Sequence, residues 1–394
     1  LLGKQKKEGC RGAPAAFNMQ TSRSDSKDNR EMIENLIKRW IRPEVQAINA
    51  YHVADAEGLI KLDAMENPFT WPNELRDDWA RLIRDTDVNR YPDPQAQELT
   101  ARLRDCMQIP QSAGVLLGNG SDEIIQMLAL ALGGEGRTVL SVEPSFVMYR
   151  MIASFSGLNY VGVPLRANDF SLDEEALMAA IEEHEPALLF LAYPNNPSGN
   201  LFDTTVIERI IRAMPGLGII DEAYAPFTDA TFMPRIGEFD NMVVMRTVSK
   251  MGLAGLRLGL LAGPQAWIEQ IDKTRLPYNI NVLTQLSADF ALRHKAVFDV
   301  QTESIRTMRG YLMRSFEAME GIEPFPSDAN FILLKTPDGK ATAIFESLKE
   351  QGVLIKKLHG SHPMLTDCLR VTVGTSEENS AMVTAFEQAL GDTL

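Results

Sequence analysis

Residues 187–199 read ALLFLAYPNNPSG, residues 216–224 read GLGIIDEAY, and residues 242–250 read MVVMRTVSK. Each segment is a short, nearly continuous apolar run that ends in a polar cluster. Such runs are typical of strands that are buried on both faces of a parallel sheet. Ligands of open α/β sheets bind outside the carboxyl ends of the strands. We therefore expect the clusters PNNPSG, DEAY and TVSK, together with GNGSDE (118–123), to converge on one crevice.

The same alternation of strands and helices extends towards the N-terminus. VLL (115–117) leads into GNGSDE and a helical run, TVLSV (138–142) leads into EPSF, and YVGVPL (160–165) precedes a helix with Ser171 or Asp173 as its expected cap. Downstream, a helical stretch over roughly 281–320 is followed by short apolar runs that indicate a small sheet. The pattern predicts an α/β fold, with a mainly parallel sheet between helices in a large domain and a smaller α+β domain.

We expect domain boundaries near residues 30, 78 and 278. Residues 31–78 would form an N-terminal arm and part of the small domain, 79–278 the large domain, and 279–394 the C-terminal small domain. EMIENLIKRWI (31–41) has helical spacing and is expected to pack on the body of the protein or on a partner subunit. Residues 1–30 are expected to be disordered. A targeting remnant, upstream sequence read in frame and a remnant of cloning remain alternative origins for the first residues, with Met19 as a natural start.

The composition is that of a globular protein with a sizeable core, at 394 residues and 45% hydrophobic content. The net charge of −14 gives no sign of the basic surface that binds nucleic acid or an anionic membrane. No apolar run approaches the roughly 20 residues that span a bilayer. The three cysteines are scattered, as in a reducing compartment, so we expect a cytoplasmic protein. The five histidines show no ligand spacing, and no metal site is expected.

GNGSDE (118–123) has two interpretations on its own residues. Gly118 and Gly120 would let backbone amides face an anion at the helix N-terminus. Alternatively, the segment is an ordinary turn in which Ser121 or Asp122 caps the helix. A nucleotide P-loop is excluded, because no Gly-Lys-Ser/Thr follows.

Several of these motifs together resemble the fold-type I aminotransferases, which depend on pyridoxal phosphate. DEAY (221–224), SK (249–250), GLAGLRLG (252–259) and AYPNNPSG (192–199) carry this resemblance. LDAMENP (62–68), NRYP (89–92) and GNGSDE narrow it to the histidinol-phosphate aminotransferase branch, over the chain from about residue 45 onward. The resemblance implies a seven-stranded type of sheet in the cofactor-binding large domain, and a homodimer with shared active sites.

The resemblance also implies how the cofactor is held. Lys250 would bind it covalently and shuttle protons, and a carboxylate at Asp221 would keep its ring nitrogen protonated. Asn196 and Tyr224 would donate to the ring oxygen, and Phe146 would stack on the ring where many relatives have tyrosine. The remaining cofactor contacts that it implies are Ser121, Asp122, Glu123, Ser249 and Arg257, with Thr247 as a weaker candidate and Tyr91 reaching across the dimer interface.

Substrate recognition is implied at Arg370, in LRVTVGT, which would bind the carboxylate of glutamate and the phosphate of histidinol phosphate. Lys356, in GVLIKK, stands where relatives often have a second arginine, and a lysine lacks the bidentate fork of arginine. Tyr51 and Asn67 match positions on the substrate side. Three activities remain open: histidinol-phosphate aminotransferase, a broader aromatic aminotransferase, and the related threonine-phosphate decarboxylase.

Overall fold

The computed structural model describes residues 23–50 and 54–393, and the chain divides into two units, Leu1–Tyr51 and His52–Leu394. In the first unit, helix α1 (Arg23–Trp40) is followed by the short helix α2 (Pro43–Gln46). Helix α1 contains the predicted amphipathic run, and its apolar side chains Met32 and Trp40 are exposed. The helix begins inside the segment expected to be disordered. Once a helix has nucleated, each further residue is added at little cost.

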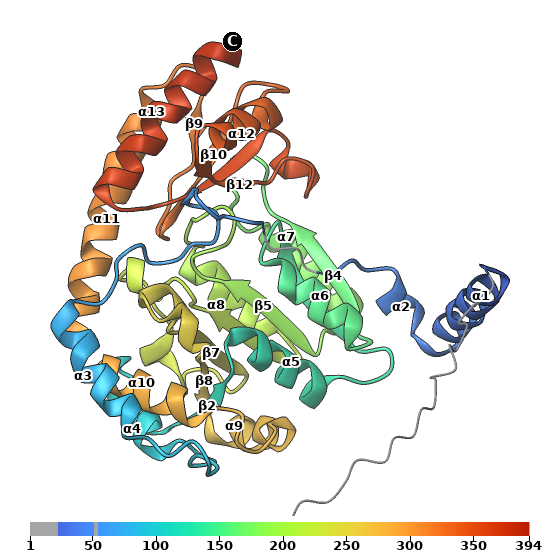
Figure 1. The fold of residues 1–394 in the computed structure, drawn as a ribbon. Coiled ribbons are helices and arrows are strands. Elements are labelled where there is room, and N and C mark those ends of the chain that lie inside the picture. The colour runs from blue at the N-terminus through green and yellow to red at the C-terminus, as the bar shows by residue number, and fades with distance from the viewer. Residues whose placement is uncertain (1–22, 51–53, 394) are drawn as a thin grey trace, which may run out of the picture. The chain divides into compact units, whose positions relative to one another are not determined.

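The second unit is built on a seven-stranded sheet (Figure 1). Strand β8 is antiparallel to both of its neighbours, and the other strands are parallel to one another. The prediction of a mainly parallel sheet is therefore confirmed. In spatial order the strands are β2 (Ala113–Gly118), β8 (Gly259–Pro264), β7 (Met242–Thr247), β6 (Leu217–Asp221), β5 (Leu188–Ala192), β3 (Thr138–Glu143) and β4 (Asn159–Pro164).

Both faces of this sheet are covered, which explains why its strands are apolar throughout. In β5, Leu188 and Phe190 belong to one hydrophobic cluster, and Leu189 and Leu191 belong to the cluster on the other face. The first face is covered by α5 (Ser121–Leu132), α6 (Val147–Phe155) and α9 (Gln265–Ile271). The second is covered by α4 (Gln97–Cys106), α7 (Glu174–His184), α8 (Thr204–Ala213) and α10 (Val282–Arg293). Asp173 caps α7 by accepting from the Ala176 amide (3.2 Å).

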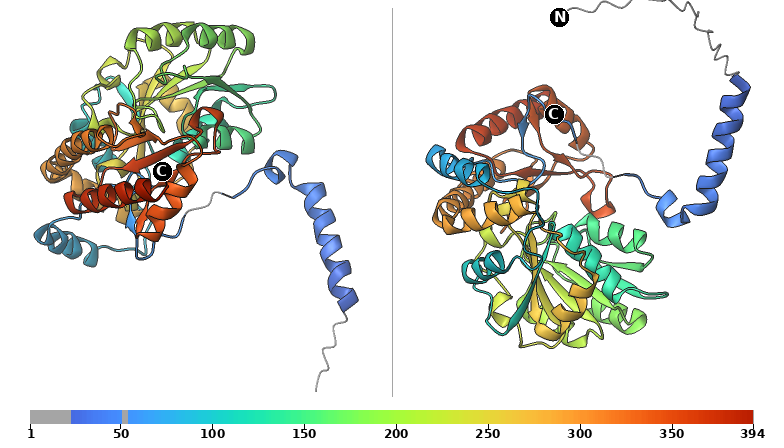
Figure 2. Two further views of the ribbon diagram at one scale, coloured as in Figure 1. Left: turned by 90° about the horizontal axis from the view of Figure 1, so that it is seen from above. Right: turned by 60° about the horizontal axis from the view of Figure 1, so that its bottom comes forward.

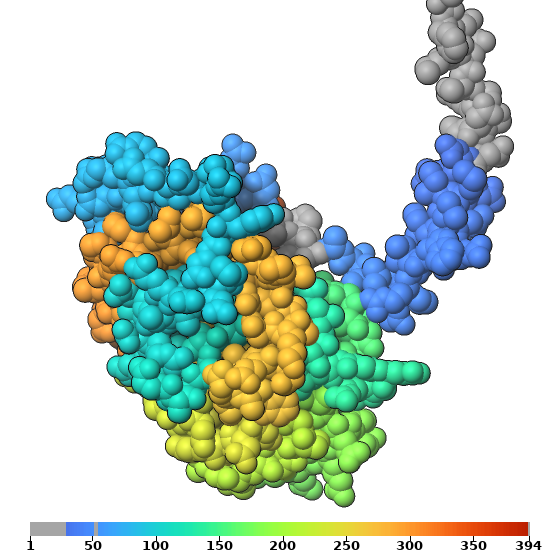
Figure 3. Space-filling view, turned by 90° about the horizontal axis from the view of Figure 1, so that it is seen from below, coloured from blue at the N-terminus to red at the C-terminus, as the bar shows by residue number. Residues whose placement is uncertain are grey.

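A helical layer at the edge of the sheet joins distant parts of the sequence. Helix α3 (Asn73–Arg84) and α4 lie beside α10, as the cyan and orange surfaces of Figure 3 show. Trp79 Nε1 donates to Ser287 Oγ (2.8 Å), and Arg102 forms an ion pair with Asp289 (3.0 Å). The stretch predicted over 281–320 is two helices, α10 and α11 (Lys295–Glu317), because the chain turns at His294.

The C-terminal part carries a second, smaller sheet, drawn in orange and red in Figures 1 and 2. Its antiparallel strands are, in spatial order, β12 (Lys356–Lys357), β13 (Cys368–Thr372), β10 (Phe331–Lys335) and β9 (Glu323–Pro324). A parallel pair, β1 (Ile60–Lys61) and β11 (Val353–Leu354), forms a separate two-stranded sheet. Helices α12 (Ala341–Glu350) and α13 (Ser376–Thr393) pack with α11 and this sheet around a separate hydrophobic cluster.

The carboxyl ends of β5, β6 and β7 lie side by side and position the polar clusters. Ala192 pairs with Asp221, and Asp221 pairs with Met245.

Within residues 23–50 and 54–393, no helix has the length and apolar character needed to cross a membrane. The short 3-10 helices are η1 (Ala225–Phe227), η2 (Met233–Arg235), η3 (Ser249–Met251), η4 (Ala254–Leu256), η5 (Asp272–Thr274) and η6 (Pro363–Leu365).

Candidate active site

A cavity of about 240 Å³ lies at the carboxyl ends of β5, β6 and β7, where the sequence predicted a crevice. Polar clusters from different strand ends meet there because parallel strands end at the same edge of the sheet. The residues predicted from the sequence that line this cavity are Ser121, Asp122, Phe146, Asn196, Asp221, Tyr224, Thr247, Ser249, Lys250 and Arg257.

Lys250 lies in η3, directly after β7, and its amine faces the cavity. Its Nζ donates to the Ala64 carbonyl (3.2 Å) and lies 5.8 Å from the centre of the Tyr224 ring. Burial, together with the positive charge of Arg370, lowers the pKa of this amine to about 8. A lysine with this pKa is partly neutral near neutral pH, which makes it a competent nucleophile.

Asp221 ends β6 and is buried, with 4% of its surface exposed. Its Oδ2 accepts from the Tyr149 hydroxyl (2.6 Å), and its Oδ1 accepts from the Ala223 amide (3.1 Å). Burial raises the pKa of the Asp221 carboxyl to about 6, and the hydrogen bond from Tyr149 acts in the opposite direction. A carboxylate held in this way can pair with a protonated ring nitrogen.

A chain of hydrogen bonds links the large sheet to the small one across the cavity. Arg370 Nη1, on β13, donates to Asn196 Oδ1 (2.6 Å), and Asn196 Nδ2 donates to the Tyr224 hydroxyl (3.0 Å). Arg370 Nη2 donates to the Asp63 carbonyl (3.0 Å). Lys356 on β12 is the register partner of Arg370, so the two cations lie side by side on adjacent strands.

The N-terminus of α5 has the form of an anion cup. Its N-cap is Gly120 (φ 83°), and neither Ser121 nor Asp122 caps the helix, so the alternative of an ordinary capped turn is not observed. A Cβ on Gly120 would lie 2.6 Å from Arg257 Nη2, so glycine leaves room for the guanidinium beside the first turn of the helix. Arg257 also lies 3.4 Å from Asp122 Oδ2. The amides of this helix turn and the Arg257 guanidinium can bind the anionic oxygens of a phosphate.

The β7 side of this cup is ordered by two hydroxyl groups. Thr247 Oγ1 accepts from the Ser249 amide (3.1 Å), donates to the Leu258 carbonyl (3.0 Å), and lies 2.8 Å from Ser249 Oγ. Both residues are buried, with 6% and 7% exposed. The hydrogen bonds fix the start of η3 and hence the direction of Lys250.

Two residues that the sequence placed in the site are turned away from the cavity. Glu123 Oε2 accepts from the Asn119 amide (2.6 Å) and from Asn279 Nδ2 (2.8 Å), so this carboxylate orders the Gly-rich turn instead. Asn67 Nδ2 donates to the Met251 carbonyl (3.2 Å), and its Oδ1 accepts from the Phe69 amide (2.9 Å). The Asn67 NH2 group thus braces the loop that follows Lys250, and the Asn67 carbonyl oxygen fixes the turn at Phe69.

Two further residues cannot be placed in the cavity of this chain. Tyr91 is 80% exposed and stacks on Tyr278, with ring centres 4.4 Å apart. Its predicted contact across a dimer interface therefore stays a prediction. Tyr51 lies outside the described residues.

Sequence reasoning missed two contributors to the site. Tyr149, which donates to Asp221, lies three residues after Phe146 in SFVMY, and that helical spacing was the available signal. The segment Ala64–Glu66 lines the cavity, and Met65 adopts a left-handed backbone (φ 53°) there. Nothing in the local sequence of LDAMENP indicates that conformation, since left-handed backbone is rare outside glycine and asparagine.

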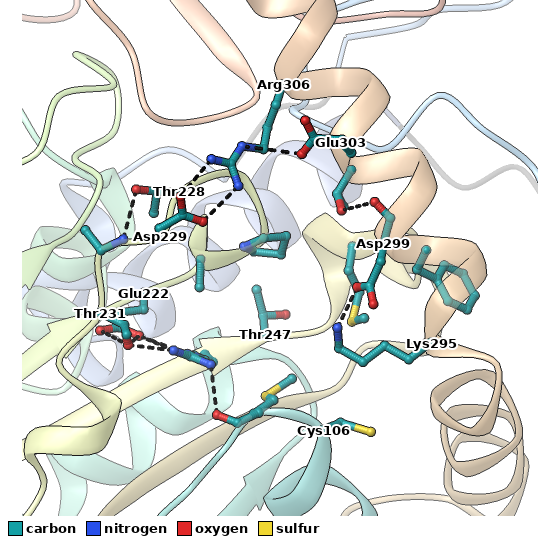
Figure 4. A pocket seen from close by; sticks show the side chains of 18 residues that line it. Cys106, Glu222, Thr228, Asp229, Thr231, Thr247, Lys295, Asp299, Glu303 and Arg306 are labelled. Carbon is teal, nitrogen blue, oxygen red and sulfur yellow. Dashed lines mark hydrogen bonds and ion pairs between the residues drawn. The ribbon is translucent and has the colours of Figure 1, made fainter.

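A second cavity, of about 350 Å³, borders the same strand ends and is shown in Figure 4. One wall is the buried ion pair of Glu222 and Arg246 (2.7 Å), to which Thr231 adds a hydrogen bond (2.8 Å). This pair joins the end of β6 to β7, next to Asp221 and Thr247. The other cations of this cavity also pair with acids, Lys295 with Asp299 (2.5 Å) and Arg306 with Asp229 (3.0 Å).

Comparison with known proteins agrees with this arrangement. The chain is 55% identical over 356 residues to histidinol-phosphate aminotransferase 2 of Nitrosococcus oceani, covering 90% of this chain and 99% of that one. It is 51% identical over 352 residues to histidinol-phosphate aminotransferase of Chromobacterium violaceum, covering 89% and 98%. The crystal structure of histidinol-phosphate aminotransferase from Sinorhizobium meliloti in complex with pyridoxal-5'-phosphate has the same fold, with a TM-score of 0.80 at 21% identity over 90% of this chain and 98% of that one.

The family assignment rests on most of the chain. Residues 57–386 match the family described as aminotransferase class I and II. This range contains every described residue that lines the candidate cavity. The chain is a member of the class I and II aminotransferase family.

Proposed function

We propose that this chain is a histidinol-phosphate aminotransferase that uses pyridoxal 5'-phosphate. It would transfer an amino group reversibly between L-histidinol phosphate and 2-oxoglutarate, giving imidazole acetol phosphate and L-glutamate, in L-histidine biosynthesis. The observation that carries this proposal is the extent of the similarity: relatives with this name are 46–55% identical over nearly their whole length. A cytoplasmic location and a homodimer are part of the same proposal.

Bound pyridoxal phosphate supplies an electron sink for the charge that develops when the substrate Cα loses its proton. In this proposal Lys250 would hold the cofactor covalently, and its amine would carry the proton to and from the substrate Cα. Its lowered pKa, about 8, suits an amine that both accepts and donates a proton near neutral pH.

The other cavity residues are proposed to hold the ring and the phosphate. Asp221 faces the ring nitrogen, Asn196 and Tyr224 donate to the ring oxygen, and Phe146 covers one ring face. The hydrogen bond from Asn196 to Tyr224 (3.0 Å) supports their joint action at one oxygen. The phosphate would be bound by the amides of Ser121 and Asp122, the hydroxyl of Ser249 and the guanidinium of Arg257.

Arg370 is proposed to bind the distal anion of both substrates. Arg370 is 6% exposed and is already oriented by Asn196 and by the Asp63 carbonyl, so little side-chain entropy is lost on binding. Lys356, its register partner, would add a second positive charge for the phosphate of histidinol phosphate. A dianionic phosphate gains more from this second cation than a monoanionic carboxylate does.

The homodimer and the domain division are proposed on different grounds. Tyr91 and its stacking partner Tyr278 present exposed aromatic surface, and exposed aromatic rings are enriched at protein interfaces. In the proposed dimer, Tyr91 reaches the cofactor phosphate of the partner. The separate hydrophobic cluster around the small sheet supports a C-terminal small domain beside a large domain, proposed over 279–394 and 79–278, although α10 within the first range packs on the large sheet.

The proposal is tested by single-turnover half-reactions of the cofactor-loaded protein. Histidinol phosphate, phenylalanine and threonine phosphate are each mixed with the protein, and loss of its yellow absorbance is followed. We expect histidinol phosphate to react at least about 100-fold faster than phenylalanine, because the phosphate gains charge-assisted hydrogen bonds at Arg370. Comparable rates with phenylalanine would favour an aromatic aminotransferase, and release of carbon dioxide from threonine phosphate would favour the decarboxylase.

A further inference from the structure

Tyr149 occupies a position that the proposed reaction does not yet use. It is 1% exposed on α6, and its hydroxyl donates to Asp221 Oδ2 at 2.6 Å. Its ring stacks on Phe190, with centres 4.7 Å apart and planes at 15°, and meets the edge of Phe146 at 5.5 Å. The ring is thus fixed on two sides, and its hydroxyl points at the Asp221 carboxylate.

The carboxylate is held by donors from two different elements. Tyr149 on α6 occupies Oδ2, and the Ala223 amide beyond β6 occupies Oδ1 (3.1 Å). With both oxygens engaged, the carboxylate plane cannot rotate without breaking a buried hydrogen bond, which is costly. Each oxygen keeps a further lone pair for a partner in the cavity.

We propose that Tyr149 is a positioning residue, which sets the orientation and proton affinity of Asp221 and thereby the charge on the cofactor ring nitrogen. This inference rests on the proposed function, because it requires pyridoxal phosphate in the cavity. Tyr149 itself contacts neither the substrate nor the reacting atoms.

The electrostatic consequence follows from burial. A buried carboxylate tends to take up a proton, and a hydrogen bond donated to its charged form opposes this tendency. Without the Tyr149 hydroxyl, Asp221 would bind a proton more tightly and would stabilise positive charge on a cofactor ring nitrogen less. The pKa of the nitrogen that joins Lys250 to the cofactor would then rise.

Other charges act on the same groups and stay in place when Tyr149 is changed. Asp122 and Glu222 act on Asp221. Lys250 is influenced by Arg370, Arg257, Glu66 and Asp122. A shift caused by the loss of one hydroxyl is therefore assigned to Tyr149 alone.

The test is Tyr149→Phe in the cofactor-loaded protein, with two readouts. In a pH titration of the cofactor absorbance, we expect the midpoint to rise by about 0.5 to 1 unit. In steady-state assays, kcat should fall about tenfold while KM for glutamate changes less than about twofold, because the hydroxyl acts on the chemical step. An unchanged midpoint overturns the proposal.

Two matched variants separate positioning from packing. Phe190→Leu loosens the stacking of Tyr149 but keeps its hydroxyl, and Tyr160→Phe removes a hydroxyl from β4, beside Arg150. Tyr160→Phe should not move the midpoint, and Phe190→Leu should move it less than Tyr149→Phe does; an equal shift in Phe190→Leu would contradict the proposal. Should Tyr149→Phe not fold, 3-fluorotyrosine at position 149 provides a stronger donor and should lower the midpoint; no shift would refute the idea. If the proposed function itself is wrong, the wild-type protein will show neither cofactor absorbance nor amino transfer. That result differs from a normal wild-type protein with an unchanged midpoint in Tyr149→Phe.

Discussion

The two ends of the candidate site are built in different ways. At the cofactor end, Asn196, Asp221 and Lys250 lie at or just after the carboxyl ends of β5, β6 and β7, which are parallel neighbours in one sheet, and all line one cavity. At the substrate end, Arg370 and Lys356 come from a separate antiparallel sheet. Tyr91, proposed to complete the site from a partner subunit, is exposed on the surface of this chain.

This difference shows which parts of an active site a fold guarantees. The geometry of a parallel sheet brings the carboxyl ends of its strands together, and no contact with another domain is needed for this. The substrate end depends instead on how the small sheet docks on the large one, through the contacts of Arg370 with Asn196 and Asp63. We therefore expect changes at the cofactor end to abolish chemistry and changes at the substrate end to alter selectivity.

The largest effect is expected for Lys250→Ala. Without the amine, the protein should lose its yellow absorbance, and kcat should fall about 10,000-fold or more, because both covalent attachment and proton transfer are lost. Absorbance spectra and steady-state rates measure this. Lys273→Ala, at an exposed lysine, serves as the control and should behave as wild type. A yellow, active Lys250→Ala protein would contradict the cofactor assignment.

A smaller effect, of about 100-fold, is expected for Arg370→Ala in kcat/KM for both glutamate and histidinol phosphate. Its removal deprives both anions of a buried guanidinium, while Lys250 and the residues proposed to bind the cofactor phosphate stay in place, so the protein remains yellow. Lys356→Ala should cost only about fivefold, and only with the phosphate ester. Loss of activity with one substrate alone in Arg370→Ala would indicate a separate phosphate site.

The pH dependence of cofactor uptake tests the cofactor end of the site without involving the substrate end. Because the pKa of Lys250 is lowered to about 8, its neutral amine is present at lower pH than in an ordinary lysine. The rate at which cofactor-free protein takes up pyridoxal phosphate should rise about tenfold per pH unit below pH 8 and level off above it. Stopped-flow absorbance measures this rate. A rise that continues towards pH 10 would mean that the amine is not perturbed.

The smallest signal is expected from subunit mixing. Tyr91→Ala and Lys250→Ala proteins are each deficient, but a mixed dimer has one intact site if Tyr91 acts across the interface. Equal amounts, dissociated and reassociated, should recover about a quarter of wild-type activity, since half of the dimers are mixed and each has one of two sites. No recovery, although mass spectrometry detects mixed dimers, would place Tyr91 outside the partner's site.

The sequence predicts most of the large sheet and the cofactor end, for a physical reason. Apolar strands such as ALLFLA and turns such as GNGSDE can be recognised from short stretches of sequence. Because parallel strands end at the same edge of the sheet, the residues that follow these strands are expected to lie together. Features set by tertiary packing are different. The left-handed Met65, the hydroxyl of Tyr149 on Asp221, and the turning away of Glu123 and Asn67 depend on distant partners. No local pattern specifies those contacts.

The central claim is that Lys250 holds the cofactor, and one measurement tests it directly. Cofactor-loaded protein is reduced with borohydride, digested, and analysed by peptide mass spectrometry for the residue that carries the cofactor mass. We predict that the modification lies on Lys250 alone. A modification on another lysine, or none in protein that is visibly yellow, would contradict this assignment and the site built around it.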